Sequence, residues 1–94
     1  MAHEILKIKD KYFIWSSIVD APISKGMNIV ELHEWTGKEG GLTLLRELPQ
    51  RLVRVEKKGT SSFIHDSLEH RIYGNHAGWN GECLTADEIY KEYT

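Results

Sequence analysis

The segment YFIWSSIVDAP occupies residues 12–22, and its first eight residues leave no face suited to water. Read at a period of two, one face carries a tyrosine, two isoleucines and a serine, and the other carries a phenylalanine, a tryptophan, a serine and a valine. This alternation is typical of a strand that is covered on both sides. We therefore predict a buried strand over Tyr12–Val19, with Trp15 in the core, that ends at Asp20-Ala21-Pro22.

The preceding segment predicts an antiparallel partner for this strand. Glu4–Lys9 places Leu6 and Ile8 on one face, and Asp10-Lys11 provides a short polar turn. The first two strands should therefore form an N-terminal hairpin.

Capping boxes predict where three helices begin. A capping residue is followed three positions later by glutamate at Asn28, Asp66 and Thr85. Apolar residues recur at helical spacing after each of them, so these helices should cover the sheet.

The middle of the chain allows two interpretations. A helical stripe is formed by Leu45, Leu48, Leu52 and Val55. Because proline disrupts a helix interior, this stripe predicts one helical piece over 43–48 and a second piece from Pro49 to Gly59. Alternatively, 52–56 and 60–64 form a β-hairpin, since valines 53 and 55 are β-branched. The stripe favours the helix.

Together these elements predict an α+β fold for a single globular domain over residues 1–94. Its N-terminal antiparallel β-hairpin, which another strand could extend, would be packed by three to five short helices. A hairpin over 52–64 would instead give a ferredoxin-like split βαβ arrangement.

The composition narrows the class of protein. With 94 residues, 40% of them hydrophobic and 28% charged, the chain resembles ordinary globular domains. A formal net charge of -2 does not favour nucleic-acid binding. The sequence has no apolar run long enough for a membrane span, no secretory signal pattern and one cysteine, Cys83, so we expect a cytoplasmic protein.

The candidate site is the loop from Gly74 to Gly81, which has turn chemistry and no periodicity. Its candidate residues for binding a ligand or partner are Asn75, His76, Trp79 and Asn80, to which we add the acidic residue Asp20. The competing interpretation, which we favour, is a connector whose Trp79 packs into the core.

Motifs for catalysis are missing from the sequence. Histidines 65, 70 and 76 lie five and six positions apart, which does not match the i, i+4 spacing of a helical zinc site. There is also no Gly-x-Ser-x-Gly elbow and no phosphate-binding loop. We therefore expect no metal or cofactor, and an enzyme is the less favoured class.

Charge is divided unevenly along the chain. Basic residues gather over 46–58, and acidic residues gather over 82–92. Opposite charges of this kind can steer association between two chains.

We expect a small non-enzymatic cytoplasmic protein that acts through protein–protein interaction or self-association. The alternative is a small-molecule binder or enzyme that uses the 74–81 loop.

Overall fold

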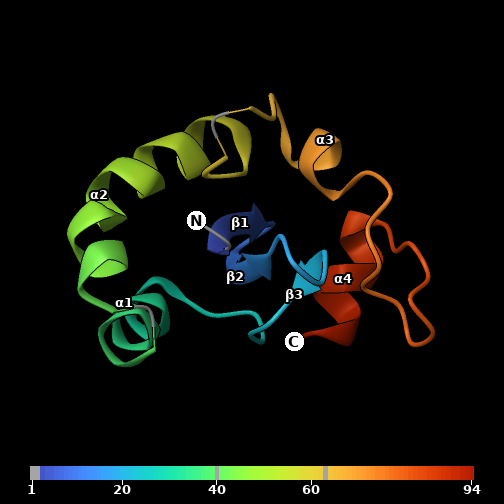
Figure 1. Ribbon diagram of the computed structural model, residues 1–94, viewed down its shortest axis with the longest axis horizontal. Helices are drawn as coiled ribbons and strands as arrows, with labels where there is room; N and C mark the ends of the chain where they lie inside the picture. Colours follow the sequence, from blue (N-terminus) through green and yellow to red (C-terminus); the bar gives the residue numbers. More distant parts are fainter. Residues whose placement is uncertain (1–2, 40, 63) are drawn as a thin grey trace.

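A three-stranded antiparallel sheet lies at the centre of the computed structural model, which describes residues 3–39, 41–62 and 64–94 (Figure 1). The strands are β1 (His3–Ile8), β2 (Lys11–Ser16) and β3 (Ala21–Pro22), in the order β1-β2-β3. Ile8 pairs with Lys11, so the hairpin turn is Lys9-Asp10, one residue earlier than predicted. The α+β class and the extended N-terminal hairpin are confirmed.

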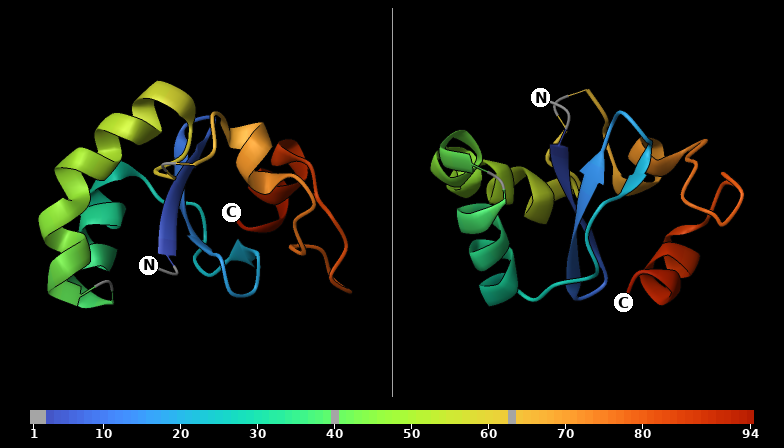
Figure 2. Two further views of the ribbon diagram at one scale, coloured as in Figure 1. Left: turned by 45° about the horizontal axis from the view of Figure 1, so that its top comes forward. Right: turned by 60° about the horizontal axis from the view of Figure 1, so that its bottom comes forward.

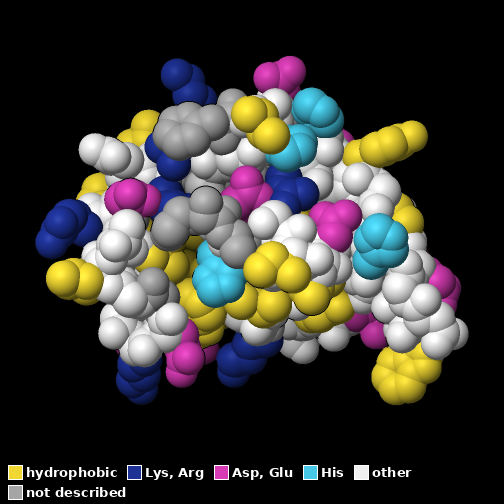
Figure 3. Space-filling view, viewed as in Figure 1, with side chains coloured by type: hydrophobic (Ala, Val, Ile, Leu, Met, Phe, Trp, Pro, Cys, Tyr) yellow, Lys and Arg dark blue, Asp and Glu magenta, His cyan; other side chains and the backbone are white. Residues whose placement is uncertain are grey.

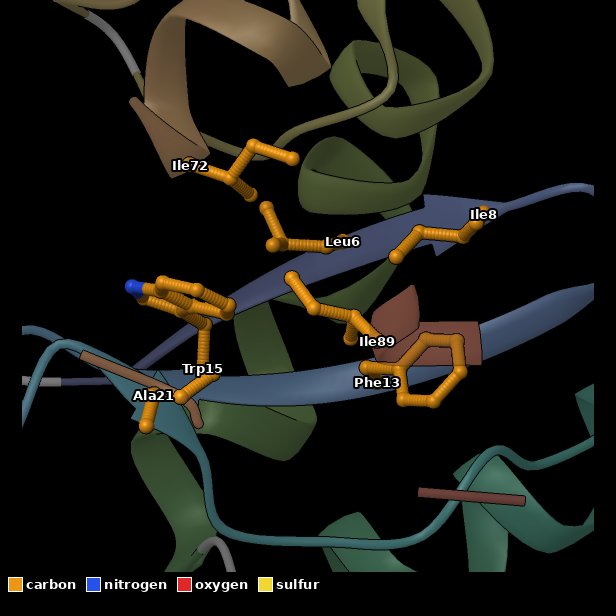
Figure 4. Packing of buried hydrophobic residues seen from close by; sticks show 8 residues of the cluster. Leu6, Ile8, Phe13, Trp15, Ala21, Ile72 and Ile89 are labelled. Atoms are coloured by element: carbon orange, nitrogen blue, oxygen red, sulfur yellow. The ribbon is translucent and has the colours of Figure 1, made fainter. Parts of the chain in front are cut away.

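Both faces of β2 are buried over residues 12–16, as predicted for this part of the segment. On one face, Phe13 and Trp15 pack with Leu6 of β1 against helices near the C-terminus. Figure 4 shows Trp15, Leu6, Ile72 and Ile89 pointing toward one another in this cluster. On the other face, Ile14 packs with residues of the first two helices.

The strand ends earlier than the predicted Val19. Ile18 is 81% exposed and Val19 is 54% exposed, so burial on both faces is wrong for this part of the segment. The Ser16 hydroxyl accepts hydrogen bonds from the backbone amides of both residues, and Asp20 has a left-handed φ of 54°. The chain therefore turns after Ser16, and β3 returns beside β2.

Helix α1 (Ile29–Lys38) begins at the predicted capping box. The Asn28 side chain accepts from the Glu31 amide at 2.8 Å, and the Glu31 carboxylate accepts from the Asn28 amide at 2.9 Å. Leu32 is buried against the sheet side that also receives the next helix.

Helix α2 (Gly41–Lys58) is continuous through Pro49, so the predicted break is wrong. Leu44 and Leu48 before the proline, and Val55 after it, are all buried. Packing on the sheet therefore holds the helix together although proline removes a backbone hydrogen bond. The helix over 52–58 is confirmed, which contradicts the hairpin and the ferredoxin-like alternative; Phe63 of that hairpin lies outside the described residues.

Residues 59–61 turn back along the outer edge of β1. Gly59 has a φ of +84°, and its carbonyl accepts from the Lys7 amide at 3.0 Å. The Ser61 amide donates to the Ile5 carbonyl, and the Ile5 amide donates to the Ser61 hydroxyl, both at 2.9 Å. This short segment satisfies backbone groups of β1 that an edge strand would otherwise expose.

Two short helices, α3 (Leu68–Ile72) and α4 (Ala86–Glu92), cover the opposite face from α1 and α2 (Figures 1 and 2). The cap of α3 is Ser67, one residue after the predicted Asp66, and α4 begins at the predicted Thr85–Glu88 capping box. Within the described ranges, no helix has the length and apolar character needed to cross a bilayer.

Candidate functional site

Asn75 is the internal anchor of the 74–81 loop. Its side chain is 1% exposed and makes four hydrogen bonds to the backbone. The side-chain amide donates to the carbonyls of Ile72 and Leu84, and the side-chain oxygen accepts from the amides of Ala77 and Leu84. These bonds tie the start of the loop to the segment that leads into α4.

His76 and Asp20, which were predicted to share a site, do lie together. The His76 amide donates to the Asp20 carbonyl at 3.0 Å, and His76 Nδ1 lies 3.6 Å from Asp20 Oδ2. Asp20 Oδ1 accepts from Trp15 Nε1 at 3.3 Å and from Arg71 at 3.5 Å. The Asp20 carboxylate therefore joins the loop to the core tryptophan.

Arg71 completes this junction, and no motif or spacing in the sequence would have identified it. Its guanidinium lies between Asp20 and Glu4, pairs with both carboxylates, and sits 5.5 Å from the centre of the Trp15 ring. A buried arginine is stable when its charge is paired in this way. The cluster fastens β1, α3 and the 74–81 loop to one another.

Trp79 lies outside the core, so the predicted packing is wrong. It is 97% exposed, and Asn80 beside it is exposed as well. The Gly78 amide donates to the Glu82 carbonyl at 2.7 Å, and the Gly81 amide donates to the Gly78 carbonyl at 3.0 Å. This tight turn places the tryptophan at the tip of the loop, while Asn75 and Ala77 occupy the buried positions.

A hollow of about 540 Å³ runs from Trp79 to α4. Its lining consists of Ala77, Gly78, Trp79, Glu82, Leu84, Glu88, Glu92 and Tyr93. Three of these residues are glutamates and none is a lysine, arginine or histidine, so we name it the acidic groove. A cationic or amide-rich group would find complementary charge there.

Two contacts fix the floor of the acidic groove. The Tyr93 hydroxyl donates to the Ala77 carbonyl at 2.6 Å, and burial, followed by the nearby Glu92 carboxylate, raises the pKa of the Tyr93 phenol. Glu88 accepts from the Thr85 amide at 2.9 Å within the capping box of α4. These hydrogen bonds hold the Tyr93 and Glu88 side chains in place in the floor of the groove.

A serine–histidine contact lies elsewhere, after α2. Ser62 Oγ is 2.7 Å from His65 Nδ1, and burial, with smaller contributions from Arg71 and His70, lowers the pKa of the His65 imidazole. Among the described residues, no carboxylate or carbonyl binds the other ring nitrogen of His65, so the orienting member of a catalytic triad is missing. The same residues contain no cluster of three potential metal ligands.

Comparisons with protein-family models, curated proteins and solved structures found no match for this chain.

Proposed function

We propose that the protein is a non-enzymatic binding module that acts by docking another protein chain at the acidic groove. The observation that carries this proposal is the exposure of Trp79, which is 97% exposed on a loop whose backbone is tied at both ends. Tryptophan is enriched among the residues that dominate binding energy at protein interfaces. A rigid loop that presents it binds at a small cost in conformational entropy.

The chemistry of the groove defines the partner. Glu82, Glu88 and Glu92 favour a partial positive charge on the docked surface, and the exposed indole favours an apolar side chain or a cation over its ring. The partner surface should therefore combine an apolar side chain with flanking lysine or arginine. We place this binding in the cytoplasm, because the free Cys83 thiol is exposed and suits a reducing compartment.

The test uses two synthetic peptides that differ only in charge. One carries leucines flanked by lysine and arginine, and in the other every basic residue is replaced by glutamate. We expect the basic peptide to shift the indole resonance of Trp79 in a nitrogen–proton NMR spectrum and the acidic peptide to leave it unchanged. Trp79→Ala should weaken binding of the basic peptide by about tenfold or more, as is typical of a hot-spot residue.

Tyr73→Ala is the matched control, because Tyr73 is 87% exposed and lies outside the lining of the acidic groove. This variant should bind the basic peptide as the parent does. Equal binding by Trp79→Ala and the parent protein, or an indole resonance that neither peptide moves, would refute the proposed function.

A further inference from the structure

Helix α2 carries a second exposed apolar surface, which its own sheet leaves uncovered. Leu42 is 69% exposed, Leu45 is 41% exposed and Val53 is 66% exposed. With Pro49 between them, these residues recur at spacings of three and four and so share one side of the helix. We name Leu42, Leu45, Pro49 and Val53 the outer face of α2.

The charge beside the outer face of α2 is positive. Both flanking basic residues are exposed: Arg46 lies beside Leu42 and Pro49, and Lys57 lies one turn beyond Val53. The carboxylate on this side, Glu56, is already engaged by the Lys7 ammonium at 3.1 Å and by the Tyr12 hydroxyl at 2.6 Å. The outer face of α2 is therefore an apolar surface flanked by positive charge, which is opposite in sign to the charge of the acidic groove.

The two surfaces lie at opposite ends of the molecule. In Figures 1 and 2, α2 lies on one side of the sheet, and the 74–81 loop lies on the other, beside α4. In the face drawn in Figure 3, Lys and Arg side chains lie over the left and centre, and none lies over the right-hand end. One molecule therefore cannot bring its own two surfaces together, but two copies can.

We propose that the partner of the acidic groove is a second copy of this chain, which docks through the outer face of its α2. A shallow depression lined by Pro49, Leu52, Val53, Glu56 and Lys57 would receive Trp79. Arg46 and Lys57 of one copy would then face the three glutamates of the other. This inference rests on the proposed function and names its partner.

The contact joins two different surfaces, so it leaves one free surface at each end of a pair. Such head-to-tail contacts produce closed rings or open chains, whereas a contact between identical surfaces stops at a dimer. The mass of the assembly should therefore rise with protein concentration, and it should fall with added salt because the paired charges are exposed.

The decisive experiment mixes two variants in the analytical ultracentrifuge. Trp79→Ala impairs the acidic groove and leaves α2 intact, while Val53→Glu places a like charge on the outer face of α2 and leaves the groove intact. We expect each variant alone to be a monomer. The equal mixture should form a one-to-one dimer that does not grow, because only one complete contact remains. Thermal melts of both variants establish that they are folded, and Tyr73→Ala, which alters neither surface, should assemble like the parent.

Other outcomes overturn the inference. A parent protein that stays monomeric at high concentration rules out self-docking. Self-association of Trp79→Ala alone indicates a contact between two copies of α2, and self-association of Val53→Glu alone indicates a contact between two grooves. The peptide titration separates the two proposals: a basic peptide that still binds at Trp79 retains the proposed function with a different partner, and a peptide that does not bind refutes both.

Discussion

Asn75 and Trp79 lie four positions apart in one loop, and each is in an environment that is unusual for its side chain. Amides are mostly exposed in folded proteins and tryptophans are mostly buried, yet here Asn75 is enclosed and Trp79 is in water. The asparagine is stable inside because every polar atom of its side chain is hydrogen-bonded. The loop is therefore held by a polar anchor, and its large apolar side chain is available for binding.

This arrangement predicts opposite effects for two alanine substitutions. Asn75→Ala removes the side-chain partner of the Leu84 carbonyl and of the Ala77 and Leu84 amides, while the Ile72 carbonyl keeps its backbone bond, and it should lower the free energy of unfolding by about 2–4 kcal/mol. Trp79→Ala removes no buried contact and should change it by less than about 0.5 kcal/mol. Urea unfolding of the two variants measures both values. A large loss for Trp79→Ala would show that the indole packs against the fold in solution.

The starts of the helices were predictable from the sequence, and the continuity of α2 was not. The Asn28 and Thr85 caps depend on residues three positions apart, so the sequence alone contains the whole signal. The course of α2 through Pro49 depends on packing against strands that lie far away in sequence. A local rule about proline cannot include that burial, and it therefore predicted a break.

Gly59, which follows α2, has both a left-handed backbone conformation and a close neighbour, and comparison with Gly81 separates the two effects. Gly59 and Gly81 both have positive φ, of +84° and +79°, so alanine should cost about 1–2 kcal/mol at either position. A Cβ at Gly59 would also lie 2.9 Å from Leu68 Cβ, whereas a Cβ at Gly81 has nothing within 4 Å. Gly59→Ala should therefore be the more destabilising by about 1–3 kcal/mol. Equal melting temperatures for the two variants would contradict the close contact with Leu68.

Glu56 links α2 to the sheet and should make that link pH-dependent. Hydrogen bonds from the Tyr12 hydroxyl and then from the Lys7 ammonium hold the pKa of its carboxyl below the ordinary value of 4.5. A lowered pKa in the folded state stabilises the fold fully above the ordinary value, and this stabilisation is lost as the pH falls below that value and through the lowered pKa of the folded state. The melting temperature of Glu56→Gln should therefore fall less than that of the parent between about pH 6 and pH 3. Glu34→Gln, at an exposed site on α1, removes one carboxylate without touching the link between α2 and the sheet and is the matched control.

At the scale of the whole molecule, one sheet separates two cores. The two-sided apolar pattern of residues 12–16 predicted this division, because a strand without a polar face requires cover on both sides. The sequence could not assign α1 and α2 to one side and α3 and α4 to the other, since helical stripes do not identify their partners. For the same reason, it placed Asp20 and His76 together but did not identify Arg71 between Asp20 and Glu4.

Two separate cores should respond independently to small cavities. Ile5 belongs to the cluster with α1 and α2, and Ile89 belongs to the cluster with α3 and α4. Each change to valine should cost about 0.5–1.5 kcal/mol, and the double variant should show the sum within about 0.5 kcal/mol. Chemical unfolding of the three variants provides the comparison. A coupling well above that margin would mean that the sheet transmits strain from one core to the other.

The segment that runs along β1 also bears on how the chain reaches this fold. Gly59 and Ser61 bond to β1 across more than fifty positions of sequence, so this edge closes only when the chain after α2 reaches β1. Until then, β1 is a free template on which a second molecule could add a strand. Refolding is therefore a kinetic competition between closure of the edge within one chain and pairing between chains. Only the second process accelerates with protein concentration, so dilute refolding should give the higher yield of folded protein.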